Sequence, residues 1–301
     1  MRFASDARRL AWALFASAFA FAGCRLFVDL DGLGDGPPPD GAASDGGSDV
    51  VDGSAFTDAP FDAPIDVVEE PLPDGGCPHL GGPTPLRVTN GPVSFCIDST
   101  EVTREQYLAF LESNPNTSTQ GPLCQWNSSF VPDQEWPYVP ADKDLPVVGV
   151  DWCDAFAFCA WAGKRMCRGI GGTPLARADA FDPGKSEYTF ACSRGGARQY
   201  PYGNLYNPQS CNGADKSAGR LLRVGSVPTC QGGFDGLFDM SGNAHEWIDA
   251  CDSSGSDPAQ HPCELTGSSF THGEPDMACT KYETTTRSGT LFEFSFRCCS
   301  P

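Results

Sequence analysis

Apolar residues in this chain fall in short runs separated by turn-forming residues. Polar and apolar positions alternate over residues 93–97, which predicts a strand. Thr103 followed by Gln106 is a capping-box pattern and predicts the start of a helix. The apolar face expected for this helix consists of Tyr107, Phe110 and Leu111. A strand followed by a short amphipathic helix therefore opens the patterned part of the chain.

The next patterned stretch repeats this order. Residues 146–150 form a short apolar run that predicts a second strand. Asp151 can cap a helix over residues 152–162, and Gly163 can end it. From Gly169 onward Gly, Pro, Asn and Ser recur so often that long regular elements are not expected. The pattern favours a loop-rich α+β domain.

The amino terminus has the form of an export signal. Arg2, Arg8 and Arg9 precede an apolar run of 12 residues, Leu10–Phe21, interrupted only by Ser17. This run is shorter than the roughly 20 residues that span a bilayer, but it suits a signal peptide.

The signal region ends in Phe-Ala-Gly-Cys, which resembles a bacterial lipobox. We expect residues 1–23 to be a lipoprotein signal peptide and Cys24 to carry the lipid. The chain would then be an exported lipoprotein, anchored in a membrane and facing the periplasm or the cell surface. The alternative is an ordinary secretory signal cleaved nearby, which also exports the protein.

Residues 24–76 have a different composition, rich in Asp, Gly and Pro. Residues 25–76 contain eleven Asp, two Glu and a single basic residue, Arg25, within a chain whose formal net charge is −19. Such a segment buries little apolar surface, so we expect a disordered acidic tether. A calcium-binding acidic repeat is the alternative, although the Asp spacing is irregular. The acidic balance argues against a nucleic-acid partner.

Cysteine content points to a disulfide-stapled domain over residues 77–301. The chain has 15 cysteines, and assigning Cys24 to lipid leaves 14, enough for up to seven disulfides. Short loop closure suggests the local pairs Cys211–Cys230 and Cys251–Cys263. The alternative is a zinc site that uses His245, His261 or His272, but no Cys-x₂-Cys pair with matching His spacing occurs.

Residues 236–247 carry the clearest candidate chemistry. Asp239 and Glu246 bracket a Gly-Asn-Ala turn, and this combination of carboxylates and backbone carbonyls is the kind of oxygen-rich set that calcium prefers. The alternative is a Gly-Asn turn that leads into a strand, with two solvated acids.

Several segments occur in an order that resembles one family. They are 95–103 (FCIDSTEVT) with Tyr107, 146–155 (PVVGVDWCDA), 159–165 (CAWAGKR), 192–196 (CSRGG), 200–203 (YPYG), 236–247 and 296–298 (FRC). Together they resemble the formylglycine-generating enzyme, or sulfatase-modifying factor, family over residues 93–298. The resemblance implies a C-type lectin-like fold with little regular secondary structure and structural calcium.

The resemblance also implies specific residue roles. One calcium site would use Asp239, Gly242, Ala244 and Glu246, and a second would begin at Asn212 and Gly213 without further ligands that can be placed. The implied disulfides are Cys159–Cys298 and Cys192–Cys279.

The chain departs from the family's enzymes in the segment 267–279. The enzymes hold copper with two cysteines there, since soft thiolates select Cu(I), but this segment has no cysteine before Cys279. We therefore expect no formylglycine formation, and copper is not expected. His272 and Glu274, with Asp276, are candidate ligands of an iron site; the alternative is a solvated loop.

Two functions follow from this reading. The first is a non-catalytic, calcium-stabilised module that binds a peptide, a glycan or a cell-envelope protein. The second is an oxidoreductase of the same family that uses a different metal site, with non-heme iron or copper.

Overall fold

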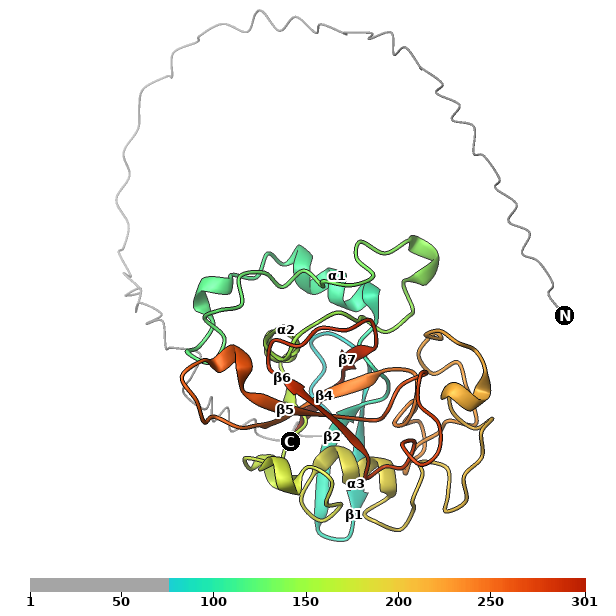
Figure 1. The fold of residues 1–301 in the computed structure, drawn as a ribbon. Coiled ribbons are helices and arrows are strands. Elements are labelled where there is room, and N and C mark those ends of the chain that lie inside the picture. Colours follow the sequence, from blue (N-terminus) through green and yellow to red (C-terminus); the bar gives the residue numbers. More distant parts are fainter. Residues whose placement is uncertain (1–75) are drawn as a thin grey trace, which may run out of the picture. The chain divides into compact units, whose positions relative to one another are not determined.

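The structure, a computed structural model, describes residues 76–301. The predictions for the signal peptide, for lipidation at Cys24 and for the acidic tether lie outside the described residues. Within the described part the chain is a loop-rich α+β domain with three α-helices and two four-stranded sheets (Figure 1). This confirms the expected fold class. Across these same residues, no helix has the length and apolar character needed to cross a membrane.

The first sheet has the strand order β1-β2-β8-β3 and is antiparallel throughout. Its strands are β1 (Pro85–Asn90), β2 (Val93–Asp98), β8 (Cys298–Ser300) and β3 (Arg165–Met166). The predicted strand at 93–97 is thus confirmed as β2. Gly91, with φ of 63°, makes the two-residue turn between β1 and β2.

The second sheet has the order β6-β5-β4-β7 and combines antiparallel pairs with one parallel pair. Its strands are β6 (Tyr282–Thr286), β5 (Pro262–Thr266), β4 (His245–Cys251) and β7 (Phe294–Phe296). β4 runs parallel to β7, and its residue His245 pairs with Phe294. This register brings the 236–247 motif beside the end of the chain.

The predicted helices form, and their caps are those expected from the sequence. α1 (Arg104–Glu112) begins at a capping box made by Thr103 and Gln106. α2 (Trp152–Trp161) begins at a second capping box, made by Asp151 and Asp154. A third helix, α3 (Glu187–Ser193), was not predicted. Short 3₁₀ helices are Thr117–Thr119, Pro140–Asp142, Ile170–Gly172, Arg177–Asp179, Ala214–Lys216 and Pro258–Gln260.

The prediction of a strand at residues 146–150 was wrong. The segment is buried, but its backbone pairs with several separate partners instead of one strand. Val147 N–H donates to Val102, Gly149 N–H donates to Leu291, and Gly149 O accepts from Asp133. Gly149 has φ of 73°, and a Cβ there would lie 2.4 Å from the backbone of Gln134. The apolar character of residues 146–150 reflects a buried connection between elements and not a strand.

Seven disulfides use all 14 cysteines of the described residues. They are Cys77–Cys96, Cys124–Cys153, Cys159–Cys298, Cys167–Cys299, Cys192–Cys279, Cys211–Cys230 and Cys251–Cys263. Four of these are the pairs expected from the resemblance and from loop closure. The zinc-thiolate alternative is excluded for these cysteines, because each sulfur is bonded to another sulfur.

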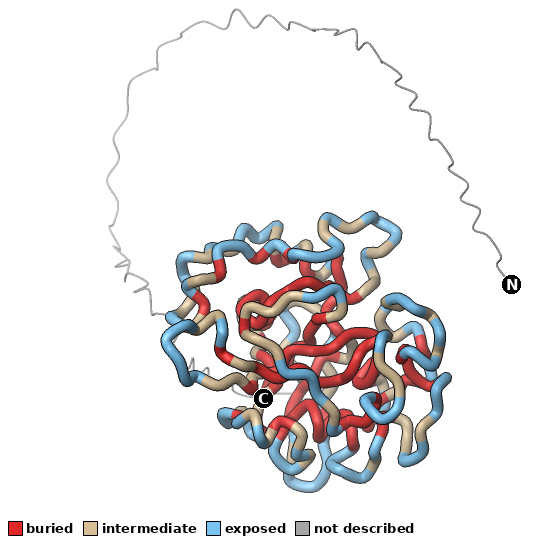
Figure 2. Tube along the Cα trace, in the orientation of Figure 1, coloured by how far each residue is buried: buried red, intermediate tan, exposed pale blue. Residues whose placement is uncertain are grey.

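The core is rich in aromatic side chains around α1, α2 and β7. The Tyr107 and Phe158 rings stack with centroids 5.6 Å apart, and Phe296 meets Phe158 edge-on at 5.2 Å. β4 passes through the buried interior (Figure 2). The core therefore holds the segment that carries the candidate functional residues.

Candidate functional site

The loop after β5, residues 267–279, has its own polar network instead of a cysteine pair. Its last residue, Cys279, is bonded to Cys192. Ser269 is fully buried, and its hydroxyl lies 2.8 Å from the Thr271 hydroxyl and 3.0 Å from His272 Nδ1. Within the described residues, this loop has no free thiolate to hold Cu(I).

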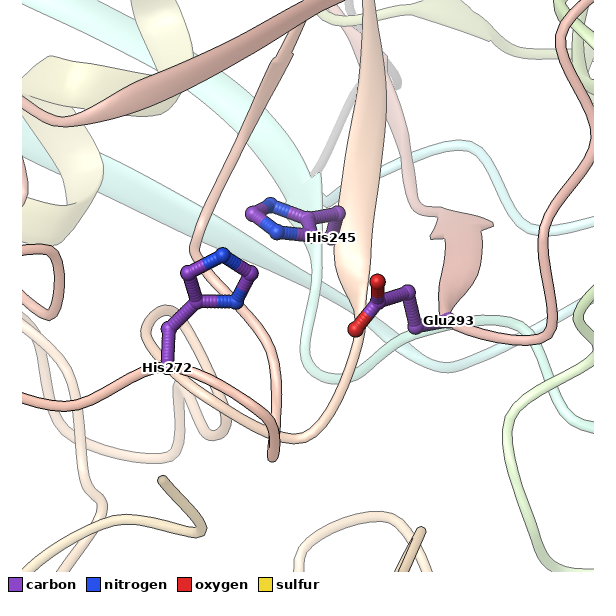
Figure 3. A group of neighbouring side chains, drawn as sticks. All are labelled: His245, His272 and Glu293. Atoms are coloured by element: carbon purple, nitrogen blue, oxygen red, sulfur yellow. The ribbon is translucent and has the colours of Figure 1, made fainter. Parts of the chain in front are cut away.

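Two histidines and a glutamate from three segments meet beside this loop (Figure 3). His245 is the first residue of β4, His272 lies in the loop, and Glu293 directly precedes β7. One potential ligand atom from each residue lies within 4.8 Å of the other two. The two imidazole rings are 4.9 Å apart at an interplanar angle of 76°. We call these three residues the His–His–Glu cluster.

Neighbouring hydroxyl groups position two members of the His–His–Glu cluster. The Ser269 and Thr271 hydroxyls donate to Glu293 Oε2 at 2.5 and 2.7 Å. The Thr271 oxygen also lies 2.9 Å from His272 Nδ1. Because both hydroxyls donate their hydrogens to the carboxylate, their oxygens can accept a hydrogen bond from His272 Nδ1–H. This arrangement favours the tautomer in which His272 Nε2 carries the lone pair.

His245 is buried without a hydrogen-bond partner. It is 3% exposed, and neither ring nitrogen makes a hydrogen bond among the described residues. Burial, and then the nearby His272, lower the pKa of His245 to about 4. The charge of Glu293, and then a contact with the backbone of Thr266 that falls short of a hydrogen bond, oppose this decrease. The imidazole is therefore neutral at physiological pH, which is the form that binds metals.

For the iron site predicted from His272, Glu274 and Asp276, the structure shows other partners for both carboxylates. Glu274 is exposed and accepts a hydrogen bond from the Tyr200 hydroxyl at 3.4 Å. Asp276 lies 4.0 Å from Lys281. The loop turns both carboxylates toward other side chains, so His272 finds its carboxylate partner, Glu293, on a different segment.

The candidate calcium motif is buried around an ion pair. Glu246 and Arg297 are fully buried and form two hydrogen bonds of 2.6 and 2.7 Å. The Tyr188 hydroxyl donates to Glu246 Oε1 at 2.9 Å. Both oxygens of Glu246 are thus already engaged by protein donors.

Two further carboxylates, those of Asp239 and Glu101, lie in the same buried region and accept fewer hydrogen bonds than Glu246 does. Asp239 is 2% exposed, and its Oδ2 accepts from Gly225 N–H at 2.6 Å. Glu101 is fully buried, and its Oε2 has no partner. Burial raises the pKa of Asp239 to about 6. Burial, and then the charges of Asp239 and Glu246, raise the pKa of Glu101 well above its ordinary value.

Asn243 links the two calcium positions expected from the sequence. Its Nδ2 donates to Glu101 Oε1 at 3.0 Å, and its Oδ1 accepts from Asn212 Nδ2 at 3.0 Å. Asn212 Oδ1 is buried without a partner. Gly242 has φ of 81°, and a Cβ there would lie 2.7 Å from the carbonyl oxygen of Asn212. The 212–213 turn and the 239–246 motif are therefore one packed unit.

The residues present fit a bound cation. Glu101, Asp239 and Glu246 are three buried acids, and among the described residues the one guanidinium in hydrogen-bond contact with them is that of Arg297. Full ionisation would leave uncompensated negative charge, which is costly away from water. The unpartnered Oε2 of Glu101 is the oxygen that such a cation would satisfy. Glu101 and Asp239 are accordingly better placed to respond to calcium than Glu246.

A groove of about 820 Å³ lies next to the His–His–Glu cluster along the chain. Phe270 adjoins Ser269, Phe292 adjoins Glu293, and the two phenyl rings are 5.9 Å apart. The groove is also lined by basic and acidic side chains: Arg104, Arg220, Arg223, Glu135 and Asp142. Arg104 lies 3.5 Å from Glu135, whereas Arg220 and Arg223 are exposed and make no ion pair among the described residues.

The sequence motif contained more of the site than it revealed. His245 and Asn243 lie inside the 236–247 run, Glu101 in the 95–103 segment, and Arg297 in the closing FRC segment. The sequence motifs around these residues indicated a structural role, and no motif near Glu293 indicates a metal site. Contacts between distant segments, seen in the structure alone, bring these residues together.

Sequence comparison identifies a family and relatives for this chain. Residues 75–300 match the family described as the sulfatase-modifying factor enzyme 1-like domain. The chain is similar to the inactive Cα-formylglycine-generating enzyme 2 of Mus musculus, with 31% identity over 175 residues, covering 52% of this chain and 49% of that protein. It is also similar to the formylglycine-generating enzyme of Bos taurus, with 29% identity over 142 residues, covering 41% and 31%.

A solved structure, PvdO from Pseudomonas aeruginosa, is similar with a TM-score of 0.46 and 20% identity, covering 69% of this chain and 80% of that one. The match spans half or less of the length of the two curated relatives. The family match, in contrast, spans nearly all of the described residues. The chain belongs to the sulfatase-modifying factor enzyme 1-like domain family.

Proposed function

We propose that this chain is an exported, lipid-anchored member of its family whose domain binds a partner and does not make formylglycine. The observation that carries the proposal is that all 14 cysteines from Cys77 to Cys299 are in disulfides. Copper chemistry on a substrate thiol needs soft thiolate ligands, and the described residues offer none. Seven disulfides also indicate folding in an oxidising compartment outside the cytoplasm.

The groove supports a partner of acidic character. Arg220 and Arg223 are exposed beside Phe270 and Phe292 and make no ion pair within residues 76–301. Phe292 is 45% exposed. Guanidinium groups bind carboxylates in paired hydrogen bonds, and exposed rings add apolar contact. An acidic peptide segment with an apolar or aromatic side chain matches this surface.

Calcium is proposed as a structural ion of the module. Glu101 and Asp239 would supply carboxylate oxygens, and the 242–244 turn is the expected source of carbonyls. Calcium would offset the excess negative charge next to Arg297 and thereby stabilise the turn that precedes β4.

The test combines activity, thiol content and binding. The purified chain, given Cu(I) and a cysteine-containing substrate peptide of the family's enzymes, should form no formylglycine and show no free thiol from residues 77–301. An acidic aromatic peptide should bind, and Arg220→Ala with Arg223→Ala should weaken binding about tenfold or more, whereas Lys185→Ala, an exposed control, should not. Formylglycine formation would overturn the proposal.

Membrane attachment is tested separately. In a bacterial host, the full chain should incorporate labelled fatty acid and partition with membranes, and Cys24→Ser should abolish both. Export of an unlipidated protein would support the ordinary secretory signal instead.

A second candidate function is a metal-dependent oxidoreductase of the same family. The observation that favours it is the His–His–Glu cluster, because two imidazoles and one carboxylate are the ligand set of many non-heme iron sites. Copper and iron should be measured in the protein as purified: a stoichiometric redox metal would favour this function over partner binding.

A further inference from the structure

We infer that His245, His272 and Glu293 form a binding site for a divalent first-row transition metal ion. This inference stands apart from the proposed partner binding and from the proposed calcium ion, and it concerns the cluster on which the second candidate function rests. The sequence patterns suggested His245 and His272 only for separate candidate sites, with cysteines or with Glu274 and Asp276, and did not include Glu293.

The donor set selects the class of metal. Two imidazole nitrogens and one carboxylate suit zinc, iron, cobalt or nickel, whereas calcium and magnesium prefer all-oxygen sets. The oxygen-rich region around Glu101 and Asp239 therefore should not compete for the same ion. Two chemically distinct cation sites would lie on the two sides of the 242–246 segment, where His245 directly precedes Glu246.

His245 supplies the strongest structural observation. The imidazole is 3% exposed and neither nitrogen has a hydrogen-bond partner among the described residues, so a buried polar group is left unsatisfied, which is unfavourable. Its ring lies nearest to that of His272, with the two ring centroids 4.9 Å apart. A metal ion between the two rings would satisfy the lone pair of each.

The surrounding hydroxyls are arranged as outer ligands of a metal commonly are. Ser269 and Thr271 bridge His272 Nδ1 and Glu293 Oε2. They leave His272 Nε2 and Glu293 Oε1 without hydrogen bonds among the described residues. Outer partners of this kind fix the tautomer and orientation of metal-binding histidines. The hydroxyls thus leave one free donor atom on each of the two residues.

The cluster is open on one side. His272 and Glu293 are partly exposed whereas His245 is buried. Zinc at about 2.1 Å from each ligand needs ligand atoms roughly 3–3.5 Å apart, so side chains now within 4.8 Å would draw together on binding. Three protein ligands leave at least one position for water or a carboxylate from a bound molecule, as in catalytic zinc sites.

The alternative is that the two histidines are neutral and have a structural packing role without a metal ion. The His245 ring also meets Phe294 edge-on at 6.1 Å. If packing were its role, His245→Phe would preserve the fold and the protein would bind no transition metal in any variant. The alternative and the inference therefore differ in a measurable quantity.

The experiment uses the full chain with its disulfides intact, purified, treated with chelator and then kept in millimolar calcium. Zinc binding is measured by calorimetry, and cobalt binding by the visible absorption that reports nitrogen and oxygen ligands. We expect the wild-type chain to bind one equivalent of zinc or, in a separate titration, one equivalent of cobalt. We also expect zinc to increase its Tm. His272→Gln and Glu293→Gln should each weaken binding by about 100-fold or more, and Ser269→Ala by about 10- to 100-fold.

His261→Gln is the matched control, because His261 is also buried, at 4% exposed, and lies outside the cluster. It should bind zinc as the wild type does. Glu293 is only partly buried, so Glu293→Gln keeps the test valid if a histidine variant fails to fold. Absence of stoichiometric zinc and cobalt binding in the wild type, or equal binding in Glu293→Gln, would overturn the inference. If the wild-type chain binds zinc but does not bind the acidic aromatic peptide, only the proposed partner binding is contradicted.

Discussion

At the residue scale, the carboxylate of Glu246 accepts hydrogen bonds from protein donors on both of its oxygens. Arg297 and Tyr188 occupy both carboxylate oxygens. A family motif that implies a calcium ligand at this position thus coincides with a buried ion pair. The residue's contribution to stability can be separated from any contribution of calcium, because the ion pair does not require the ion.

We predict that Glu246→Gln lowers the free energy of unfolding by about 3–5 kcal/mol, because it leaves the Arg297 guanidinium buried without its counter-charge. The loss should be nearly the same in calcium and in chelator, measured by denaturant unfolding. The exposed Glu283→Gln is the control and should change stability by less than about 0.5 kcal/mol. A loss confined to calcium-containing buffer would instead make Glu246 principally a calcium ligand.

Glu101 should behave in the opposite way. Its Oε2 is buried and unpartnered, and its raised pKa means that the isolated fold favours the protonated acid. Glu101→Gln resembles that protonated state, so stability in chelator should remain within about 1 kcal/mol of wild type. With calcium at a hundred times its Kd, the wild type should gain about 2.7 kcal/mol, and the variant should gain clearly less. An equal calcium response in both proteins would remove Glu101 from the site.

The contacts that make this site could not be read from the sequence. The motif predicted Asp239 and Glu246, but their environment depends on Arg297, 51 residues beyond Glu246, and Asn243 reaches Glu101 across 142 residues. Local spacing gives residue types and turns. Which distant segment supplies the counter-charge depends on the sheet register that pairs β4 with β7.

At the scale of elements, the start of α2 combines good capping with charge repulsion. Asp151 caps the helix and Asp154 completes the capping box, so two acids are buried in one turn. Asn127 donates to Asp154 at 2.8 Å. Burial raises the pKa of Asp151 to about 7, and burial together with Asp151 raises that of Asp154 well above its ordinary value; Asp133 adds a smaller effect on both.

These pKa values predict how stability depends on pH. The folded protein keeps protons on the pair at pH values where the unfolded chain has lost them, so stability falls as pH rises from about 4 towards 7 and beyond. Asp154→Asn removes one of these groups and its repulsion of Asp151. The difference in free energy of unfolding, variant minus wild type, should therefore increase from pH 5 to pH 7, by up to about 1.4 kcal/mol per pH unit.

Urea unfolding at several pH values measures this effect. The exposed Glu112→Gln serves as the control and should follow the wild-type pH profile. Parallel curves for wild type and Asp154→Asn would show that the pair is ionised in the folded protein throughout this range.

Elements with local signals were predictable, and elements defined by tertiary pairing were not. The caps at Thr103 and Asp151 fixed the starts of α1 and α2, because each cap satisfies backbone groups within its own turn. Residues 146–150 carried the apolar run of a strand but are paired to several segments. β3 is two residues long and exists because it meets β8, which no local pattern can indicate.

At the scale of the whole molecule, two disulfides connect the middle of the domain to its end. Cys159–Cys298 and Cys167–Cys299 tie the α2 region to β8, closing loops of 139 and 132 residues. Cys251–Cys263 closes only 12 residues, between β4 and β5. With few long regular elements, the domain depends on these long-range crosslinks to reduce the conformational freedom of its unfolded chain.

Loop length gives the final prediction. In the chain-entropy model a crosslink stabilises more as the closed loop grows, about 3 kcal/mol for 15 residues and about 4.7 for 100. The neighbouring Cys167–Cys299 crosslink shortens the loop that Cys159–Cys298 closes, so the test uses a chain in which Cys167 and Cys299 are already serine. In that chain the loop, closed through Cys192–Cys279, is about 52 residues, and replacing both cysteines of Cys159–Cys298 with serine should cost about 1 kcal/mol more than the same change at Cys251–Cys263, measured by denaturant unfolding with the remaining disulfides intact. Because Cys298 and Cys159 are also fully buried, alanine pairs at both positions test whether the serine hydroxyls contribute. Equal losses at the two sites would mean that local packing, and not chain entropy, sets the contribution of these crosslinks.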